Sequence, residues 1–194
     1  MYELFDAESI YPCDWMELSI FKSKIIDLQK QGYEFISLSE AHKHLKNNFV
    51  RIQEYAVLTF DDGYKSLNEV LPWLEEQQIP VTLFINGRYL DGKSYRVTSK
   101  EQFLTSDELY ALISPLIEIG HHGWEHKSVN DMSEAELIES MQKNIEILSA
   151  HPRYIPFWAY TYGIHTLSNN GMTLVLVDGG KNYKWKGSIV RELF

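Results

Sequence analysis

The chain has 194 residues, of which 44% are hydrophobic and 23% charged, so it has enough apolar material for one packed domain and is short for two. This composition excludes wholesale disorder, and the formal net charge of −9 argues against nucleic acid or an anionic membrane as partner, since both require basic patches. The single cysteine, Cys13, excludes an internal disulfide and a cysteine-rich zinc site.

No apolar run approaches the roughly 20 residues that a membrane-spanning helix needs. The opening residues, MYELFDAESIYPCDW, are acidic and lack the basic flank and apolar core of a secretory signal. We therefore expect a cytoplasmic protein without a membrane partner. Nothing in the sequence indicates the oligomeric state.

Helix and strand patterns alternate along almost the whole chain. In chain order the predicted elements are a helix over residues 15–28, a strand over 33–38, a helix over 40–48, a strand over 56–60, a helix over 66–78, a strand over 79–86, a helix over 106–114, a strand over 116–122, a helix over 134–150, and strands over 154–160, 172–177 and 188–193.

Local signals mark where several of these helices begin and end. Gly32 lies where the first helix would stop. Pro72, inside the third helix, suggests that the true start of that helix lies later. Three helices open with a possible capping box, in which a Ser or Thr and a Glu three residues later exchange hydrogen bonds: Ser37 with Glu40, Thr105 with Glu108, and Ser133 with Glu136.

Strands separated by helices imply parallel pairing and an α/β layer architecture, in a single domain over residues 1–194. Sheets of this kind place their chemistry at the carboxyl ends of the strands. Three predicted strands end in unusual residues: Asp61-Asp62, His121-His122 and Tyr160-Thr161-Tyr162-Gly163. This coincidence is the main indication of where a functional site lies.

The strand AVLTF ends in two adjacent carboxylates, Asp61 and Asp62, followed by Gly63. Like charges repel, and the end of a buried strand is a costly place for them unless a cation or a proton is available. Successive side chains of a strand point to opposite faces, so we expect the two carboxylates to diverge and to serve different roles. The alternative is that one Asp caps the following helix and the other faces water.

His122 and His126 are four residues apart, so they lie on one side of the chain whether the segment is helical or extended. That spacing suits two imidazoles on one metal ion. We expect His121 to lie beside the site or at the surface. The histidines interpreted as surface residues or as a helix cap are His42, His44 and His151.

Two imidazoles and one carboxylate on a divalent metal leave coordination positions open for water and substrate, as catalytic metal sites do. The metal would lower the pKa of bound water toward about 7. The second carboxylate would stand beside that water as general base. Zinc is the default for this ligand set, and cobalt or nickel could also occupy it.

With these residues in place, the sequence resembles the polysaccharide deacetylases of carbohydrate esterase family four, the NodB-homology domain. TFDDG resembles the first motif of that family, which implies that Asp61 is the catalytic base and Asp62 a metal ligand. HGWEH resembles the second motif, which implies that His122 and His126 are the other ligands. The likeness runs over about residues 21–193 and implies a distorted (β/α) barrel of about seven strands.

WAYTYG resembles the aromatic variant of the third family motif, in which the backbone N–H of the Tyr before the Gly helps to bind the oxyanion; this implies that role for Tyr162. Ala159-Tyr160-Thr161 departs from the Arg-Pro-Pro of many members, whose Arg orients the base. No Leu-His motif follows to supply the general acid, and His165 is the last histidine of the chain. His165 is therefore a candidate proton donor, and the alternative is a plain loop histidine.

These features favour a metal-dependent hydrolase that removes N-acetyl groups from an acetylated amino sugar or polysaccharide. An O-acetyl esterase on the same site is an alternative, because an alkoxide leaves more easily than an amine and needs no strong general acid. A non-catalytic carbohydrate-binding relative is another, because the third motif is degenerate. The aromatic side chains that could stack on sugar faces, at least two of which we expect in the core, are Trp124, Trp158, Tyr160 and Trp185.

Overall fold

The computed structural model describes residues 3–5, 15–46, 55–92, 102–161, 173–175 and 190–192. Its elements in chain order are β1 (Glu3–Phe5), β2 (Trp15–Glu17), α1 (Leu18–Lys30), β3 (Glu34–Phe35), α2 (Leu38–Lys46), β4 (Tyr55–Ala56), β5 (Leu58–Phe60), α3 (Leu67–Glu76), β6 (Val81–Ile85), the 3₁₀ helix η1 (Gly87–Asp91), α4 (Ser106–Tyr110), β7 (Ile117–His121), the 3₁₀ helix η2 (Val129–Asp131), α5 (Glu134–Leu148), β8 (Tyr154–Ala159), β9 (Thr173–Val175) and β10 (Val190–Glu192). None of the helices within these ranges has the length and hydropathy that a bilayer crossing requires.

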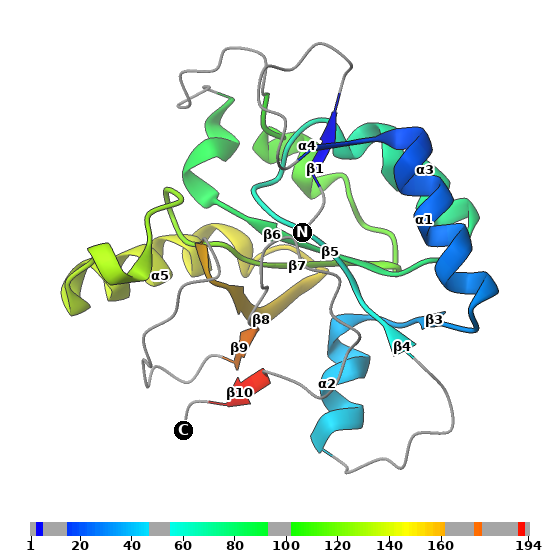
Figure 1. Ribbon diagram of the computed structural model, residues 1–194. Coiled ribbons are helices and arrows are strands. Elements are labelled where there is room, and N and C mark those ends of the chain that lie inside the picture. Colours follow the sequence, from blue (N-terminus) through cyan, green and yellow to red (C-terminus); the bar gives the residue numbers. More distant parts are fainter. Residues whose placement is uncertain are drawn as a thin grey trace.

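The largest sheet has six strands in the order β10-β9-β8-β7-β6-β5 (Figure 1). Strands β5 to β9 are parallel, and β10 pairs antiparallel with β9. Two further parallel pairs join β1 to β2 and β3 to β4. The predicted α/β architecture with parallel pairing is confirmed, because crossover helices return the chain to the same end of the sheet. The antiparallel β10 was not expected, and closure into a barrel of about seven strands stays a prediction.

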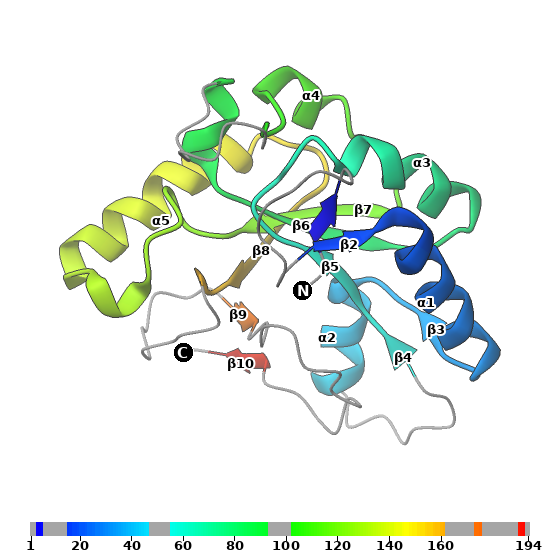
Figure 2. The same ribbon diagram turned by 45° about the horizontal axis from the view of Figure 1, so that its top comes forward.

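Strand β6 shows how the sheet is covered on both faces, because all five of its residues are buried. Val81, Leu83 and Ile85 join the largest core cluster, which also takes side chains from α1, α3, α4 and α5. Phe84 points to the other face, where it packs in a cluster with Leu38 of α2. Figures 1 and 2 show α1 and α3 side by side at one flank of the sheet and α5 at the opposite flank. Burial on both faces explains why β6 reads as a continuous apolar run.

The parallel register brings the carboxyl ends of neighbouring strands to one edge. Ile85 of β6 lies opposite His121 of β7, and His121 lies opposite Trp158 of β8. Strand β5 lies on the other side of β6 and runs in the same direction. The segments that follow β5, β7 and β8 therefore leave the sheet at the same edge, which is where the sequence predicted the site.

The predicted capping boxes define the starts of two helices. Both reciprocal hydrogen bonds are present at α4 and α5, between Thr105 and Glu108 and between Ser133 and Glu136. At α2 the backbone N–H of Glu40 donates to the Ser37 hydroxyl at 3.2 Å. These bonds satisfy N–H groups that have no partner within the first turn of a helix. The predicted helix starts at residues 106 and 134 are therefore confirmed.

Several other helix boundaries differ from the prediction. Helix α2 begins at Leu38, two residues early, and α4 ends at Tyr110 and not at residue 114. Trp15 belongs to β2, and α1 begins only at Leu18, because strand pairing with β1 takes precedence over the helical spacing of the apolar side chains. Helix α3 begins at Leu67 and keeps Pro72 inside it, so its start is not delayed. Pro72 is exposed, and the helix tolerates the lost hydrogen bond because four of its other side chains are buried in the core.

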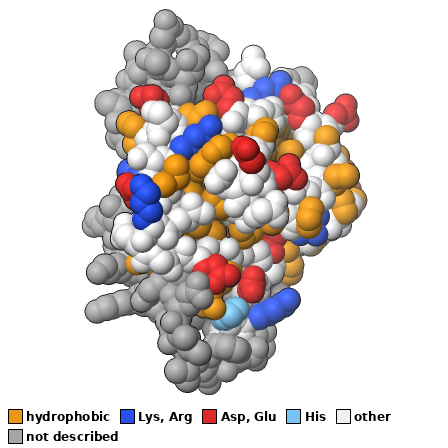
Figure 3. Space-filling view, turned by 90° about the vertical axis from the view of Figure 1, so that its right-hand side faces the viewer, with side chains coloured by type: hydrophobic (Ala, Val, Ile, Leu, Met, Phe, Trp, Pro, Cys, Tyr) orange, Lys and Arg blue, Asp and Glu red, His pale blue; other side chains and the backbone are white. Residues whose placement is uncertain are grey.

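The surface formed by α1 and α3 is mixed in character. Figure 3 shows apolar side chains interspersed with acidic and basic ones on this flank. Lys22 of α1 extends over the ring of Trp73 of α3, with its ammonium nitrogen 5.2 Å from the ring centroid. The large hydrophobic side chains that are exposed among the described residues are Ile20, Ile26 and Ile113.

Candidate metal centre

The Asp61–Asp62–Gly63 segment forms a tight turn directly after β5. Asp62 has a φ of 68° and Gly63 a φ of 83°, in the left-handed region that Asp tolerates better than most residues and Gly adopts freely. The Gly63 N–H donates to the Asp61 carbonyl at 2.8 Å, and the Gly63 carbonyl accepts from the Leu104 N–H at 2.8 Å. The two carboxylates thus lie on a bend that backbone hydrogen bonds hold in place.

The two carboxylates of this turn point to one place. Nε2 of His122 lies 3.6 Å from Oδ2 of Asp61 and 3.7 Å from Oδ1 of Asp62. Both aspartates are 2% exposed. The predicted divergence of the two side chains is wrong, because the strand ends at Phe60 and the left-handed φ at Asp62 turns its side chain back. The alternative that one aspartate faces water is also wrong, because both side chains are buried.

His122 is fully buried, and its ring is oriented by the last residue of β8. Its Nδ1 lies 3.0 Å from the Ala159 carbonyl oxygen. A carbonyl only accepts, so Nδ1 carries the proton and donates it, which leaves Nε2 with a lone pair. Nε2 is buried and has no hydrogen-bond partner among the described residues. Histidines that bind metals are typically held in this way.

The structure brings Asp62, His122 and His126 together, although His126 lies on an irregular loop and not on a helix or strand. Nε2 of His126 lies 3.3 Å from Oδ1 of Asp62, and one potential ligand atom from each residue lies within 4.8 Å of the other two. Two ligands that are each about 2.1 Å from a tetrahedral zinc ion lie about 3.4 Å apart. The two imidazoles and the carboxylate therefore fit one divalent cation with coordination positions left for water and substrate.

The pKa of Asp61 is set chiefly by its burial. Burial raises the pKa of Asp61 to about 6, against the attraction of His122, and the negative charge of Asp62 adds to the rise. A cation held beside it would lower that pKa. A carboxylate whose pKa lies near the working pH is suited to accept and release a proton, which is the behaviour of a general base.

A stack of three aromatic rings connects the aspartate turn to the histidine loop. Tyr64 follows the turn, and its ring centroid lies 4.8 Å from that of Phe103. The Tyr89 ring also stacks on the Phe103 ring, with the two centroids 4.5 Å apart. The Tyr89 hydroxyl donates to the carbonyl of Glu125 at 3.0 Å. The two segments that carry the potential ligands are thus joined through side chains from η1 and residues 102–104.

The predicted residues of the third motif are described only in part. Tyr162 and His165 lie outside the described residues, as does Trp185. Within the described part, the Thr161 hydroxyl donates to the His122 carbonyl at 3.2 Å. The Arg of the Arg-Pro-Pro version would orient the base. In its place this chain has Ala159, whose carbonyl binds the His122 ring, and further along it has Thr161, which binds the His122 backbone.

The aromatic residues near the site divide between core and surface. Trp158 and Tyr160 are each 2% exposed and pack in a cluster with Met141 of α5. Trp124 is half-buried, and the Lys143 ammonium lies 5.9 Å from a ring centroid of Trp124. The expectation that at least two of these aromatic side chains belong to the core is confirmed.

The neighbouring histidines have structural contacts of their own. His121 is buried beside Tyr154, with its Nε2 2.8 Å from the Tyr154 hydroxyl, and burial lowers the pKa of His121 to about 4. His151 follows α5, but its Nε2 lies 3.1 Å from the carbonyl of Leu109 in the last turn of α4. His151 therefore caps a different helix from the one that it follows in sequence.

The two histidines of α2 are half-buried, so their interpretation as plain surface residues is wrong. The ring of His42 packs edge-on against Phe157, with centroids 5.3 Å apart. The ring of His44 lies 5.1 Å from that of Tyr55, and its Nε2 is 3.6 Å from a Glu40 oxygen. These rings pack α2 onto β4 and β8, a contact that sequence spacing within one helix does not reveal.

Two buried asparagines next to the site were not found by the sequence analysis. Asn86 and Asn144 are each 0% exposed, and both bind backbone atoms around His122. Asn86 follows β6 at the same edge as the aspartates, so its place at a strand end is a signal that could have been used. Asn144 lies within α5, where no local pattern distinguishes it.

The family model for polysaccharide deacetylases matches residues 51–173, which is more than half of the chain and includes both aspartates and both histidines. The chain belongs to the polysaccharide deacetylase family. Its members in carbohydrate esterase family four share the NodB-homology domain, and they are hydrolases that act on carbohydrates. Among curated proteins, none matches this chain.

Solved structures of polysaccharide deacetylases share the fold. The deacetylase PplD of Streptococcus pyogenes, in complex with acetate, is 18% identical with a TM-score of 0.67, over 86% of this chain and 73% of that one. A de-N-acetylase from Aggregatibacter actinomycetemcomitans is 17% identical with a TM-score of 0.63, over 85% and 78%. IcaB from Ammonifex degensii is 20% identical with a TM-score of 0.63, over 85% and 76%. At these identities the likeness establishes a common fold.

Proposed function

We propose that the protein is a metal-dependent hydrolase that removes N-acetyl groups from an acetylated amino sugar or polysaccharide. The observation that carries the proposal is the convergence of Asp62, His122 and His126, whose potential ligand atoms lie within 4.8 Å of one another. Asp61 lies beside them, with Oδ2 3.6 Å from Nε2 of His122. Membership of the polysaccharide deacetylase family supports a carbohydrate as the substrate.

In this proposal Asp62, His122 and His126 hold a divalent cation, zinc by default, with cobalt or nickel as substitutes. The bound cation supplies Lewis acidity, which polarises an acetyl carbonyl and makes water more acidic. Asp61 is the general base and takes the proton from the attacking water. The Ala159 carbonyl keeps His122 in the tautomer whose Nε2 can donate its lone pair.

Two further roles come from the resemblance and from residues outside the described ranges. The backbone N–H of Tyr162 stabilises the tetrahedral oxyanion, an effect worth about 3–4 kcal/mol for one good donor. His165, which lies shortly after Gly163, is assigned from its place in the sequence and gives the proton that the leaving amine needs. Both residues belong to, or closely follow, the WAYTYG motif.

A second candidate function is the hydrolysis of O-acetyl esters on glycans by the same site. The observation that favours it is that residues 166–194 contain no histidine, and hence no Leu-His motif of the kind found in the family that the chain resembles. An alkoxide leaves more easily than an amine, so an esterase depends less on a strong general acid. The same residues would hold the cation and the base.

Acetate release separates these functions. We expect metal-loaded protein to release acetate from N-acetylglucosamine oligomers, and the Asp61→Asn variant to lose about 10²–10⁴-fold of that rate while it keeps its metal. Release from acetylated xylan but not from the oligomers would instead identify an esterase. Tight binding of oligomers without release from either substrate would contradict both proposals and identify a carbohydrate-binding relative.

The pH dependence offers an independent check of the ligand assignment. Imidazoles bind a metal only when they are neutral, so metal affinity and activity should fall together as the solution is made acidic. Metal content measured after dialysis at each pH should fall with the rate. Activity that stays constant from pH 8 to pH 5 with the metal still bound would contradict His122 and His126 as ligands.

A further inference from the structure

The histidine loop is held by a buried amide on a neighbouring helix. Asn144 of α5 makes three hydrogen bonds to backbone atoms: its Oδ1 accepts from the Gly87 N–H at 2.8 Å, and its Nδ2 donates to the carbonyls of Ile85 at 3.2 Å and Gly123 at 2.7 Å. The partners fix the orientation of the amide, because an N–H must face oxygen and two carbonyls must face the NH₂ group. Asn144 therefore connects the ends of β6 and β7.

A second amide binds the same loop from the other side. Nδ2 of Asn86 donates to the carbonyls of His122 at 2.7 Å and Gly123 at 3.1 Å. The His122 carbonyl also accepts from the Thr161 hydroxyl at 3.2 Å. The backbone carbonyls of His122 and Gly123 thus accept four side-chain hydrogen bonds in all, from Asn86, Asn144 and Thr161.

These side chains replace the regular backbone hydrogen bonds that the loop lacks. Gly123 has a φ of 82° and His126 a φ of 54°, so the segment continues neither the strand nor a helix. Ser140, one turn before Asn144 on the same face of α5, accepts from the Trp124 N–H at 2.9 Å. A polar stripe on an otherwise apolar helix face therefore sets the path of the chain between the two histidines.

The fit of Asn144 is close on the side of η1. A Cβ added to Gly87 would overlap Oδ1 of Asn144 and would lie 2.9 Å from the Trp124 ring. Glycine at this position is thus needed for the approach of the amide. The contact gives a way to displace Asn144 without changing it.

We propose that Asn144 is a positioning residue of the metal centre. Its amide binds the Gly123 carbonyl, next to His122, and the Ile85 carbonyl, which also accepts from the His122 N–H, and so holds His122 and His126 at ligand distance from Asp62. The proposal rests on the proposed function, because it presupposes that these three residues bind a cation. These three hydrogen bonds of Asn144 go to backbone atoms and not to the side chain of a potential ligand. It acts on the cation through the geometry of the two imidazoles.

The first test compares metal binding with stability. Asn144→Asp keeps the shape of the side chain and an acceptor for Gly87, but it turns oxygen toward the carbonyls of Ile85 and Gly123. Leu148→Ala removes a fully buried side chain one turn further along α5 and leaves the loop contacts in place. We expect Asn144→Asp to weaken zinc binding about 10-fold or more and to change the visible absorption spectrum of the cobalt-loaded protein. Leu148→Ala should lower the stability of the protein, keep its zinc affinity within about 2-fold of the original, and leave the cobalt spectrum unchanged.

Gly87→Ala is the second variant, and it keeps the test decisive if Asn144→Asp does not fold. It displaces the amide and retains both of its donors, so a smaller loss of zinc affinity with a shifted cobalt spectrum is expected. If the original protein binds zinc and the folded variants bind it equally well with unchanged spectra, the role of Asn144 is overturned and the proposed function is not. Original protein that binds no divalent metal would overturn the proposed function, and this inference with it.

Discussion

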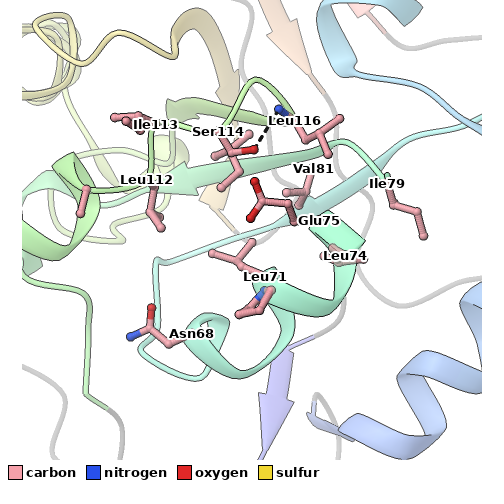
Figure 4. A pocket seen from close by; sticks show the side chains of 13 residues that line it. Asn68, Leu71, Leu74, Glu75, Ile79, Val81, Leu112, Ile113, Ser114 and Leu116 are labelled. Atoms are coloured by element: carbon pink, nitrogen blue, oxygen red, sulfur yellow. Dashed lines mark hydrogen bonds between the residues drawn. The ribbon is translucent and has the colours of Figure 1, made fainter. Parts of the chain in front are cut away.

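The two ends of strands β6 and β7 carry opposite kinds of structure. At the amino ends, a hollow of about 350 Å³ lies between α3 and residues 111–117 and is lined largely by leucine, isoleucine and valine side chains (Figure 4). At the carboxyl ends, Asp61, Asp62 and His122 are buried and His126 is half-buried, and their polar atoms are directed at one point. One sheet thus has a largely apolar hollow at one end and a group of converging polar atoms at the other.

Polar groups at the amino end are bound to backbone atoms. The Arg153 guanidinium donates to the carbonyls of Ile117 at 2.9 Å and Pro115 at 2.6 Å. Nδ1 of His151 accepts from the Arg153 N–H at 3.1 Å, so Nε2 carries the proton that binds the Leu109 carbonyl. At the carboxyl end, by contrast, both Asp61 oxygens and Nε2 of His122 have no hydrogen-bond partner among the described residues. Buried polar atoms without such partners are costly, so their grouping at this edge is consistent with the candidate metal centre.

The largest effect is expected at the carboxyl end. His122→Ala should lower zinc affinity by more than about 100-fold, beyond the 10–100-fold cost of losing an outer partner of a ligand. Metal analysis of the purified protein and acetate release should both fall together. His44→Ala is the matched control, because it removes a half-buried histidine from α2 and should keep the metal stoichiometry. Full zinc content in His122→Ala would break the contrast between the two ends.

A core truncation at the amino end should have the converse effect. Leu74 of α3 lines the hollow and is 1% exposed, so Leu74→Ala should lower the free energy of unfolding by about 2–5 kcal/mol. Zinc affinity and kcat at 25 °C should stay within about 2-fold, since the side chain lies at the far end of the strands. Urea unfolding and zinc titration of the same sample measure both quantities. A loss of zinc affinity as large as that of His122→Ala would show that the two ends are not separable.

Asp61 should make the metal-free protein less stable as the pH rises. Its pKa is about 6 in the folded protein against an ordinary value of 3.8, so between these values the folded state binds the proton and the unfolded state releases it. Stability therefore falls as the pH increases from about 4 through 6, by an amount on the order of 3 kcal/mol in total. Asp61→Asn should remove this loss and be the more stable protein at pH 7. Urea unfolding curves for both proteins in a chelator, at pH 5 and pH 7, measure the difference. An equal difference at both pH values would contradict the raised pKa.

The smallest effect is expected at His151. Burial lowers the pKa of His151 below 6.5, against the hydrogen bond to the Leu109 carbonyl and with the help of the Arg153 charge. The unfolded chain then takes up a proton first, so stability should fall as the pH drops through 6.5, by at most about 1.4 kcal/mol per pH unit. His151→Gln should flatten this slope in urea unfolding between pH 7.5 and 5.5, and zinc affinity at pH 7.5 should be unchanged. A slope identical to that of the original protein would show that His151 does not titrate in this range.

The sequence predicted the elements that depend on local signals. The capping boxes at Thr105 and Ser133 specify where α4 and α5 begin, and the β-branched runs specify β6 and β7. The strand ends also predicted which edge of the sheet carries Asp62 and His122. These features depend on a few consecutive residues, so one sequence is sufficient to find them.

Features that depend on distant contacts were not predictable in the same way. Trp15 has helical spacing, but pairing with β1 makes it part of a strand. The convergence of Asp61 and Asp62 depends on a left-handed φ that residues 102–104 support from another part of the chain. Asn144 binds backbone atoms 21 to 59 positions away, and an asparagine inside a helix has no local pattern that announces such a role.

The aromatic stack of Tyr64, Phe103 and Tyr89 bears on how the ion is acquired. Because the stack joins the aspartate turn to the histidine loop through the Glu125 carbonyl, we expect the proposed ligands to stay together without the ion. Small zinc modules, by contrast, fold only as the metal enters. Stripping the ion with EDTA should therefore leave the circular dichroism spectrum intact, and reloading should proceed with little heat-capacity change.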